Sequence, residues 1–162
     1  MTIRMVADYY YKLHEKREMT ASEWLKVLNI TMNNNIWRKS GTNKKNIIRA
    51  FKTLRFDTAI INGRNFDEKL EMIRKALHNK RPIIIYCVIR PIKEPYRHFA
   101  VVVGVNHNSI YINDPYPAKF KRNRPKRINL DTFKQSKPGV DQLVWGPVQW
   151  GIEVKKCNKK AS

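Results

Sequence analysis

One stretch constrains the fold of this chain more than any other, and it reads RHFAVVVGVNHNSIYINDPYP over residues 97–117. Residues 98–105 are almost purely apolar and β-branched, which predicts a central strand buried on both faces. Residues 109–114 alternate apolar and polar side chains, as a second strand would. The turn between them contains Gly104 and two asparagines, which tolerate the positive φ that a tight reversal demands. We therefore expect a β-hairpin.

The spacing inside this hairpin pairs two residue types that often act together in hydrolytic catalysis. If the reversal is centred on Asn106, His98 falls directly across from Asp114 on one face of the hairpin. Directly opposed Cβ atoms lie about 4.5 to 5.5 Å apart. A carboxylate at that distance can hold an imidazole in one tautomer, as in a nucleophile-His-acid triad. The alternative is a surface histidine and an Asn-Asp-Pro turn that closes a strand.

The hairpin, together with the preceding R-P-I-I-I-Y strand, resembles the C39 and C39-like cysteine peptidases, a papain-like group. The resemblance extends to T-I-R-M-V-A-D-Y-Y and G-T-N-K-K-N-I-I-R-A-F-K-T-L-R-F upstream, and weakly to I-N-L-D-T-F downstream. It implies that His98 and Asp114 are the catalytic histidine and aspartate. It also implies peptide bonds as the substrate class, cleaved after small residues as in leader-processing relatives.

The resemblance places the nucleophile outside the 162 residues. In the family, the cysteine stands in a Cys-Gly-Pro sequence at the start of the first helix, where the helix N-terminus lowers its pKa. Aligned on T-I-R-M-V, it falls about three residues before Met1, and the upstream Gln of the oxyanion hole falls earlier still.

Three alternatives follow from this missing nucleophile. The chain is a natural pseudo-enzyme, its start lies downstream of the true one, or another cysteine substitutes. Cys87 lies in the continuous apolar run I-I-I-Y-C-V-I and is expected to be a small buried core residue. Cys157 lies in the polar run K-K-C-N-K-K, where lysines could activate its thiol but nothing fixes its geometry.

Apolar periodicity predicts helices first and then mostly strands. The expected helices comprise residues 1–15, a segment opened by a Thr20–Glu23 capping box, one capped by Thr42 or Asn43, and 66–77; the further strands comprise 57–61, 83–89 and at least one within 142–154. The inward faces of the first two helices are expected to contain Ile3, Val6, Tyr10 and Leu13, and then Trp24, Leu25 and Leu28.

This order indicates an α+β domain, and the resemblance implies the papain-like arrangement of N-terminal helices on a twisted antiparallel sheet. We expect a single C39-like domain over residues 1–154 and a basic disordered tail over 155–162.

The formal net charge is +20, which predicts attraction to polyanions. The run KFKRNRPKR after the hairpin contains six basic residues and no acidic one. The candidate polyanion-binding residues are therefore Lys119, Lys121, Arg122, Arg124, Lys126 and Arg127. The alternatives for this run are a solvated loop or a surface that selects acidic peptides.

No run approaches the ~18 apolar residues of a membrane span, and the N-terminus lacks a secretory apolar region. We therefore expect no membrane span and a cytoplasmic protein. The two cysteines lack metal-ligand spacing, so no metal site, disulfide framework or cofactor is expected.

The leading hypothesis is a C39-like fold with a peptide or protein partner in its cleft, either as a non-catalytic binding module or as a truncated peptidase. The rival is a basic binding protein that contacts nucleic acid or a ribonucleoprotein surface.

Overall fold

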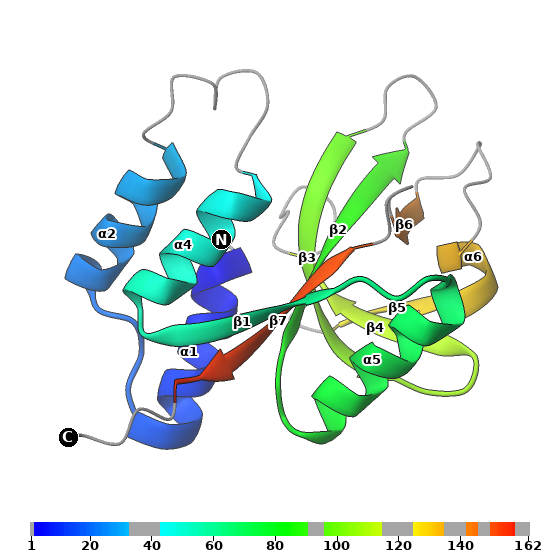
Figure 1. The fold of residues 1–162 in the computed structure, drawn as a ribbon, viewed down its shortest axis with the longest axis horizontal. Coiled ribbons are helices and arrows are strands. Elements are labelled where there is room, and N and C mark those ends of the chain that lie inside the picture. Colours follow the sequence, from blue (N-terminus) through cyan, green and yellow to red (C-terminus); the bar gives the residue numbers. More distant parts are fainter. Residues whose placement is uncertain are drawn as a thin grey trace. The chain divides into compact units, whose positions relative to one another are not determined.

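The computed structural model describes residues 2–32, 43–90, 96–114, 125–134, 142–145 and 150–157 (Figure 1). The described helices are α1 (Thr2–Glu15), α2 (Ala21–Met32), α4 (Lys44–Thr53), α5 (Phe66–His78) and α6 (Leu130–Lys134). The strands are β1 (Phe56–Ile61), β2 (Ile83–Arg90), β3 (Tyr96–Val105), β4 (Ser109–Asn113), β5 (Lys126–Asn129), β6 (Gln142–Trp145) and β7 (Gly151–Lys156). Helices precede most strands, and the fold class is α+β, as predicted.

The described chain divides into two compact units. Unit 1 contains residues 3–58 and those from Val154 onward, and unit 2 contains Thr2 and residues 59–153. The prediction of one domain over residues 1–154 stays a prediction. Lys155 and Lys156, which were expected in a disordered tail, instead belong to β7, while residues 158–162 lie outside the described part.

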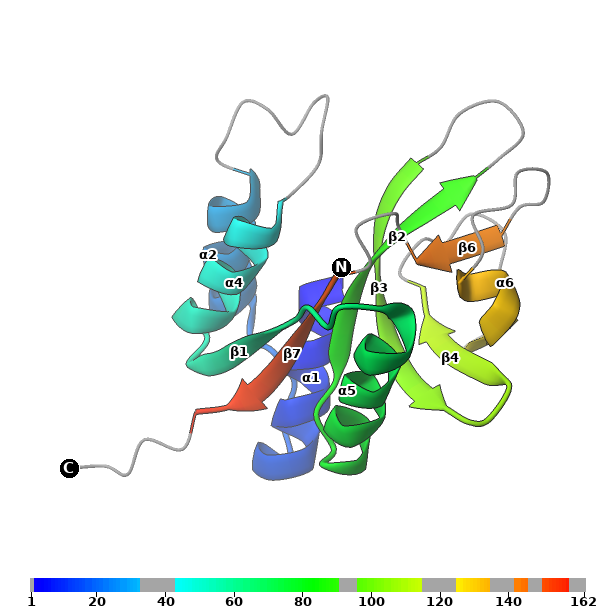
Figure 2. The ribbon, with the colours of Figure 1, turned by 45° about the vertical axis from the view of Figure 1, so that its right-hand side comes forward.

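Unit 1 is built around aromatic side chains that its helices bury. The ring of Phe56 packs on Tyr10 and Tyr11, with centroid distances of 5.1 and 5.7 Å, and meets Phe51 edge-on at 6.1 Å. Figure 2 shows α2 and α4 side by side, and Asn43 caps α4 by accepting a hydrogen bond from the Asn46 amide at 2.9 Å. The predicted cap and helix are thereby confirmed.

The predicted inward faces of α1 and α2 are confirmed only in part. Ile3, Val6 and Tyr10 are buried, but Leu13 is 40% exposed and Leu25 is 58% exposed. Both leucines lie outside the narrow stripe of side chains that reaches the core. On α2, the buried residue is Val27, which is 1% exposed. Apolar character alone therefore misplaced these two residues.

The carboxylate of Glu23 is the centre of a hydrogen-bond network at the connection between α1 and α2. Glu23 and Thr20 form the predicted capping box, because the Glu23 amide donates to Thr20 Oγ1 at 3.2 Å and the Thr20 amide donates to Glu23 Oε2 at 2.9 Å. The Arg17 guanidinium donates bidentate hydrogen bonds to the same carboxylate, to Oε2 at 2.9 Å and to Oε1 at 3.0 Å. The Tyr11 hydroxyl also donates to Glu23 Oε1, at 3.1 Å. These bonds fix the angle at which the chain enters α2.

The sheet has the strand order β1-β7-β2-β3-β4-β5, with β6 also paired to β2. The β2–β3, β2–β6, β2–β7, β3–β4 and β4–β5 pairs are all antiparallel. In unit 2, α5 lies against β2 and β3, and α6 lies against β4, β5 and β6 (Figure 2). The buried core of this unit includes Leu70, Ile73, Ile85, Val102 and Phe133. This core fixes the central strands that carry the candidate site.

Candidate functional site

The β3–β4 hairpin forms as predicted, but its turn uses a side chain instead of unusual backbone angles. Asn106 Oδ1 accepts hydrogen bonds from the amides of Asn108 at 3.0 Å and Ser109 at 2.8 Å. The Asn106 amide also donates to the Ser109 carbonyl at 2.9 Å. Neither Asn106 nor Asn108 has a positive φ. The asparagine therefore matters for the hydrogen bonds of its amide group, as in an Asx turn.

The register of the hairpin differs from the predicted one by two residues. Val101 is paired with Asn113, so the same register continued by one residue sets Asp114 opposite Ala100. The prediction that His98 lies directly opposite Asp114 is therefore wrong, and the two positions are diagonal neighbours. Such positions lie about 7 to 8 Å apart, a distance that long side chains can bridge.

The shift has two local causes. The Val105–Ile110 pair closes a turn centred between His107 and Asn108, later than the predicted centre. A bulge at Val103 then moves the register back by one residue, because Val102 pairs with Ile112 whereas Gly104 pairs with Tyr111. Val103 is consequently 40% exposed, although the sequence predicted burial on both faces of this strand.

The electrostatics of Cys87 agree with this register. The structure describes the backbone of His98 but not its side chain, and the Cα of His98 is paired with Cys87 on β2. The half-buried Asp114 acts electrostatically on that same Cys87: burial first, and then the charge of Asp114, raise the pKa of the Cys87 thiol. This effect is consistent with the register, because His98, the Cα partner of Cys87, is the diagonal neighbour of Asp114.

The first residue of α1 contacts the same part of β3. The Thr2 hydroxyl donates a hydrogen bond of 3.0 Å to the backbone carbonyl of Phe99, the residue after His98. Both groups belong to unit 2. Sequence analysis could not find this contact, because nothing local in either segment signals a bond between residues 97 positions apart. A helix start beside a strand that carries a histidine is the arrangement that activates a thiol placed there.

Neither Cys87 nor Cys157 has the environment that activates a thiol as a nucleophile. Cys87 is fully buried in the core of unit 2, as predicted, and its raised pKa disfavours the thiolate that would attack a carbonyl. Cys157 follows β7 and is half-exposed, and among the described residues no hydrogen bond fixes its thiol. The described residues therefore offer no activated thiol.

The other face of β2 and β3 carries an aromatic cluster that sequence analysis missed. Tyr86 stacks on Trp150 with a centroid distance of 5.4 Å and an interplanar angle of 8°, and Phe99 packs on both rings. The cluster depends on the pairing of β2 with β7, which no local pattern specifies. It holds the β3 backbone next to His98 in place.

Most of the predicted polyanion-binding run lies outside the described residues, namely Lys119, Lys121, Arg122 and Arg124. Lys126 and Arg127 are described and lie on β5. Arg127 Nε donates to Ser109 Oγ at 2.9 Å, so this guanidinium is engaged within the sheet.

No group of three or more His, Cys, Asp or Glu side chains in the described part of the chain could hold a metal ion. Within the same residues, no helix combines the length and the apolar character needed to cross a membrane.

Comparison with known proteins identifies one family and one fold. The model of a family described as "Peptidase_C39 like family" matches residues 2–137. The crystal structure of the peptidase domain of Streptococcus ComA, a bi-functional ABC transporter involved in a quorum sensing pathway, is similar to this chain with a TM-score of 0.54. The two sequences are 18% identical, and the match covers 96% of this chain and 93% of that one, which establishes a shared fold. No curated protein matches the chain.

Proposed function

The chain belongs to the peptidase C39-like family, and from this premise we propose that its 162 residues bind a peptide segment beside His98 and Asp114 without cleaving it. The observation that carries the proposal is the β3–β4 register, which makes His98 and Asp114 diagonal neighbours on adjacent antiparallel strands. The contact of Thr2 with Phe99 supports it, because it puts the first residue of α1 next to the same strand.

The roles of the residues follow from the chemistry of the family. In an active member, a thiolate attacks the peptide carbonyl, the histidine takes and returns the proton, and the aspartate orients the histidine. In this chain, His98 is the residue for the proton transfer and Asp114 is the residue that orients it. The first role needs an activated thiol, and burial excludes Cys87 from it. The proposal is therefore a peptidase-like binding module, and a peptidase where a Cys-Gly-Pro segment precedes these residues in the mature chain.

Peptide binding can be tested separately from cleavage. The probe is a 20-residue synthetic peptide ending in Gly-Gly, added to isotope-labelled protein while backbone amide shifts are followed by NMR. We expect shifts to concentrate around His98 and Asp114, and mass spectrometry to recover the peptide intact. Loss of these shifts in a His98→Ala variant, but not in a variant of the exposed His78 on α5, would tie binding to the site.

Two results would overturn the proposal. Cleavage of the peptide by the 162 residues alone would mean that a nucleophile exists among them. An absence of shifts on β3 and β4, with any peptide effect elsewhere, would mean that the hairpin is not a peptide site. Weighing the native N-terminus by mass spectrometry then decides between a binding module and an active peptidase.

The alternative function, a basic protein that holds nucleic acid, is supported by the formal charge of +20. On duplex DNA, each neutralised phosphate lowers the logarithm of the binding constant with a slope of about −0.9 against the logarithm of the salt concentration. A flat salt response would count against this alternative.

A further inference from the structure

Among the described helices of unit 1, α4 carries the most basic residues. α4 has the sequence KKNIIRAFKT, with four basic residues and no acidic one, and Arg55 follows its end. By contrast, α5 has the sequence FDEKLEMIRKALH, in which three acidic residues balance Lys69, Arg74 and Lys75. The two helices therefore carry very different charge although their lengths are similar.

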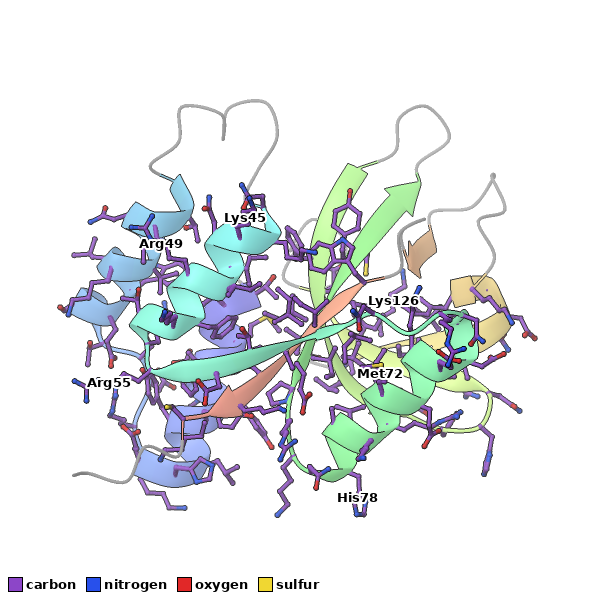
Figure 3. All side chains as sticks on the ribbon, viewed as in Figure 1. Lys45, Arg49, Arg55, Met72, His78 and Lys126 are labelled. Carbon is purple, nitrogen blue, oxygen red and sulfur yellow. The ribbon has the colours of Figure 1, made fainter. Side chains whose placement is uncertain are left out.

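The basic side chains of α4 share its exposed side. Ile47, Ala50 and Phe51 are buried, so the inward face of α4 packs within unit 1 and is not available to a partner. Lys45, Arg49 and Lys52 are exposed and recur at helical spacing. Figure 3 shows Lys45 near the first turn of α4, Arg49 further along it and Arg55 just beyond its end.

Among the described residues, the side chains of Lys45, Arg49, Lys52 and Arg55 have no acidic partner and take part in no ion pair or hydrogen bond. The Thr53 hydroxyl donates to the backbone carbonyl of Arg49 and leaves its guanidinium unengaged. The acidic residues at the α1–α2 corner are already occupied, since Glu23 binds Arg17 and Glu18 binds Lys12 at 2.7 Å. The described residues therefore leave these four positive charges without a neutralising carboxylate, an arrangement that attracts polyanions.

We propose that the exposed face of α4, formed by Lys45, Arg49, Lys52 and Arg55, binds the phosphate backbone of duplex nucleic acid. These residues belong to unit 1, whereas His98 and Asp114 belong to unit 2, and the proposal does not depend on the candidate peptide site. From Lys45 to Lys52 the helix rises about 10 Å, and over such a length of duplex axis each strand carries about three phosphates, one per 3.4 Å. The length of this face therefore allows each of its basic side chains to contact a phosphate.

The residues on this face disfavour other polyanionic partners. Binding to a membrane interface needs an apolar helix face that enters the lipid, and α4 buries Ile47, Ala50 and Phe51 inside the protein and leaves only the half-buried Ile48. Single-stranded nucleic acid is held by aromatic stacking, and the one aromatic residue of α4, Phe51, is fully buried. A protein interface needs aromatic or apolar anchors at its centre, and this face has none.

The test compares two triple variants with the same change in charge. The first replaces Lys45, Arg49 and Lys52 on α4 with Gln, and the control replaces Lys69, Arg74 and Lys75 on α5 with Gln. Each removes two lysines and one arginine, and Gln keeps helix propensity close to that of Lys and Arg. Binding of a fluorescent 20-base-pair DNA duplex is measured by anisotropy between about 50 and 200 mM salt, and circular dichroism checks that both variants are folded.

We expect the α4 variant to lose three phosphate contacts. Its salt slope should be less steep by about 2.7, so that the native protein weakens about 40-fold more than the variant across this fourfold range of salt. The α5 control should bind like the native protein.

Three outcomes would overturn the proposal. The native protein may fail to bind the duplex while it binds vesicles of anionic lipid, which would make the partner a membrane surface. Equal loss in both variants would mean that total charge, and not this face, attracts the duplex. Unchanged binding in the α4 variant would assign binding to another surface.

Discussion

The environment of Cys87 decides its reactivity. Its thiol is fully buried, and burial together with Asp114 raises its pKa, so both access and ionisation oppose reaction. We expect iodoacetamide near pH 7 to label Cys157 in the folded protein and to label Cys87 at least about 10³-fold more slowly, because exposure requires unfolding at about 5 kcal/mol or more. Quantitative mass spectrometry, before and after denaturation in guanidinium, measures both sites.

A Cys157→Ser variant is the control for this experiment. It should take up no label while folded and one label when unfolded. Labelling of Cys87 in the folded variant at the rate of a free thiol would restore Cys87 as a candidate nucleophile.

Glu23 is the second residue with a directly testable environment. Hydrogen bonds from Arg17, and then from Thr20 and Tyr11, lower the pKa of Glu23 to about 2 although burial opposes this. Because the pKa in the folded state lies below the ordinary value of 4.5, the stabilisation is present above about pH 4.5 and is lost as the pH falls toward 2. We expect Glu23→Gln to lower the free energy of unfolding by about 1 kcal/mol near pH 7, and by progressively less in more acidic buffer.

Urea denaturation at several pH values measures this effect. The matched control is Glu18→Gln, since Glu18 pairs with Lys12 but its side chain is 58% exposed. That variant should change stability less at every pH. A Glu23→Gln effect that stays constant as the buffer is acidified would show that the carboxylate is not held ionised by its partners.

At the level of elements, β7 depends on the absence of a side chain at one position. A Cβ added to Gly151 would lie 3.1 Å from the backbone oxygen of Ile84 and 3.4 Å from side-chain atoms of Ile61 and Ile83. Gly151 is buried and its backbone neighbour cannot move aside, so Gly151→Ala should destabilise the fold by about 1 to 3 kcal/mol.

Gly104→Ala on β3 provides the comparison. There the nearest atom is Cδ2 of the Tyr111 ring at 3.3 Å, and the half-buried site leaves room for a side chain to shift. Thermal unfolding of both variants should give a clearly larger loss for Gly151→Ala. An equal or reversed order would mean that β7 is not packed against β2 as described.

The elements themselves were largely predictable, because each has a local cause. The Thr20–Glu23 capping box, the Asn43 cap and the apolar run of β2 lie in contiguous sequence, and all three appear as expected. The register of the hairpin was not predictable to the residue. It depends on which backbone groups Asn106 bonds and on a bulge at Val103, neither of which changes the apolar pattern.

For the whole molecule, the family could be identified from sequence because its motifs are spread over most of the chain, and the family match over residues 2–137 confirms it. The distribution of charge could not be read in the same way. The sequence drew attention to the continuous basic run over residues 119–127. On α4, the buried Ile47 and Phe51 interrupt the charges of Lys45, Arg49 and Lys52, which form one surface only when the helix forms.

The central proposal is that the hairpin brings His98 and Asp114 together near Thr2, and all three residues belong to unit 2. The most direct test adds a Cys-Gly-Pro segment that places a cysteine about three residues before Met1, in the Cys157→Ser background, and measures the alkylation rate of that cysteine near pH 6. If the claim holds, the cysteine should react at least about tenfold faster than a free thiol, and His98→Ala should abolish the gain whereas His78→Ala should not. Equal rates in all three proteins would contradict the account.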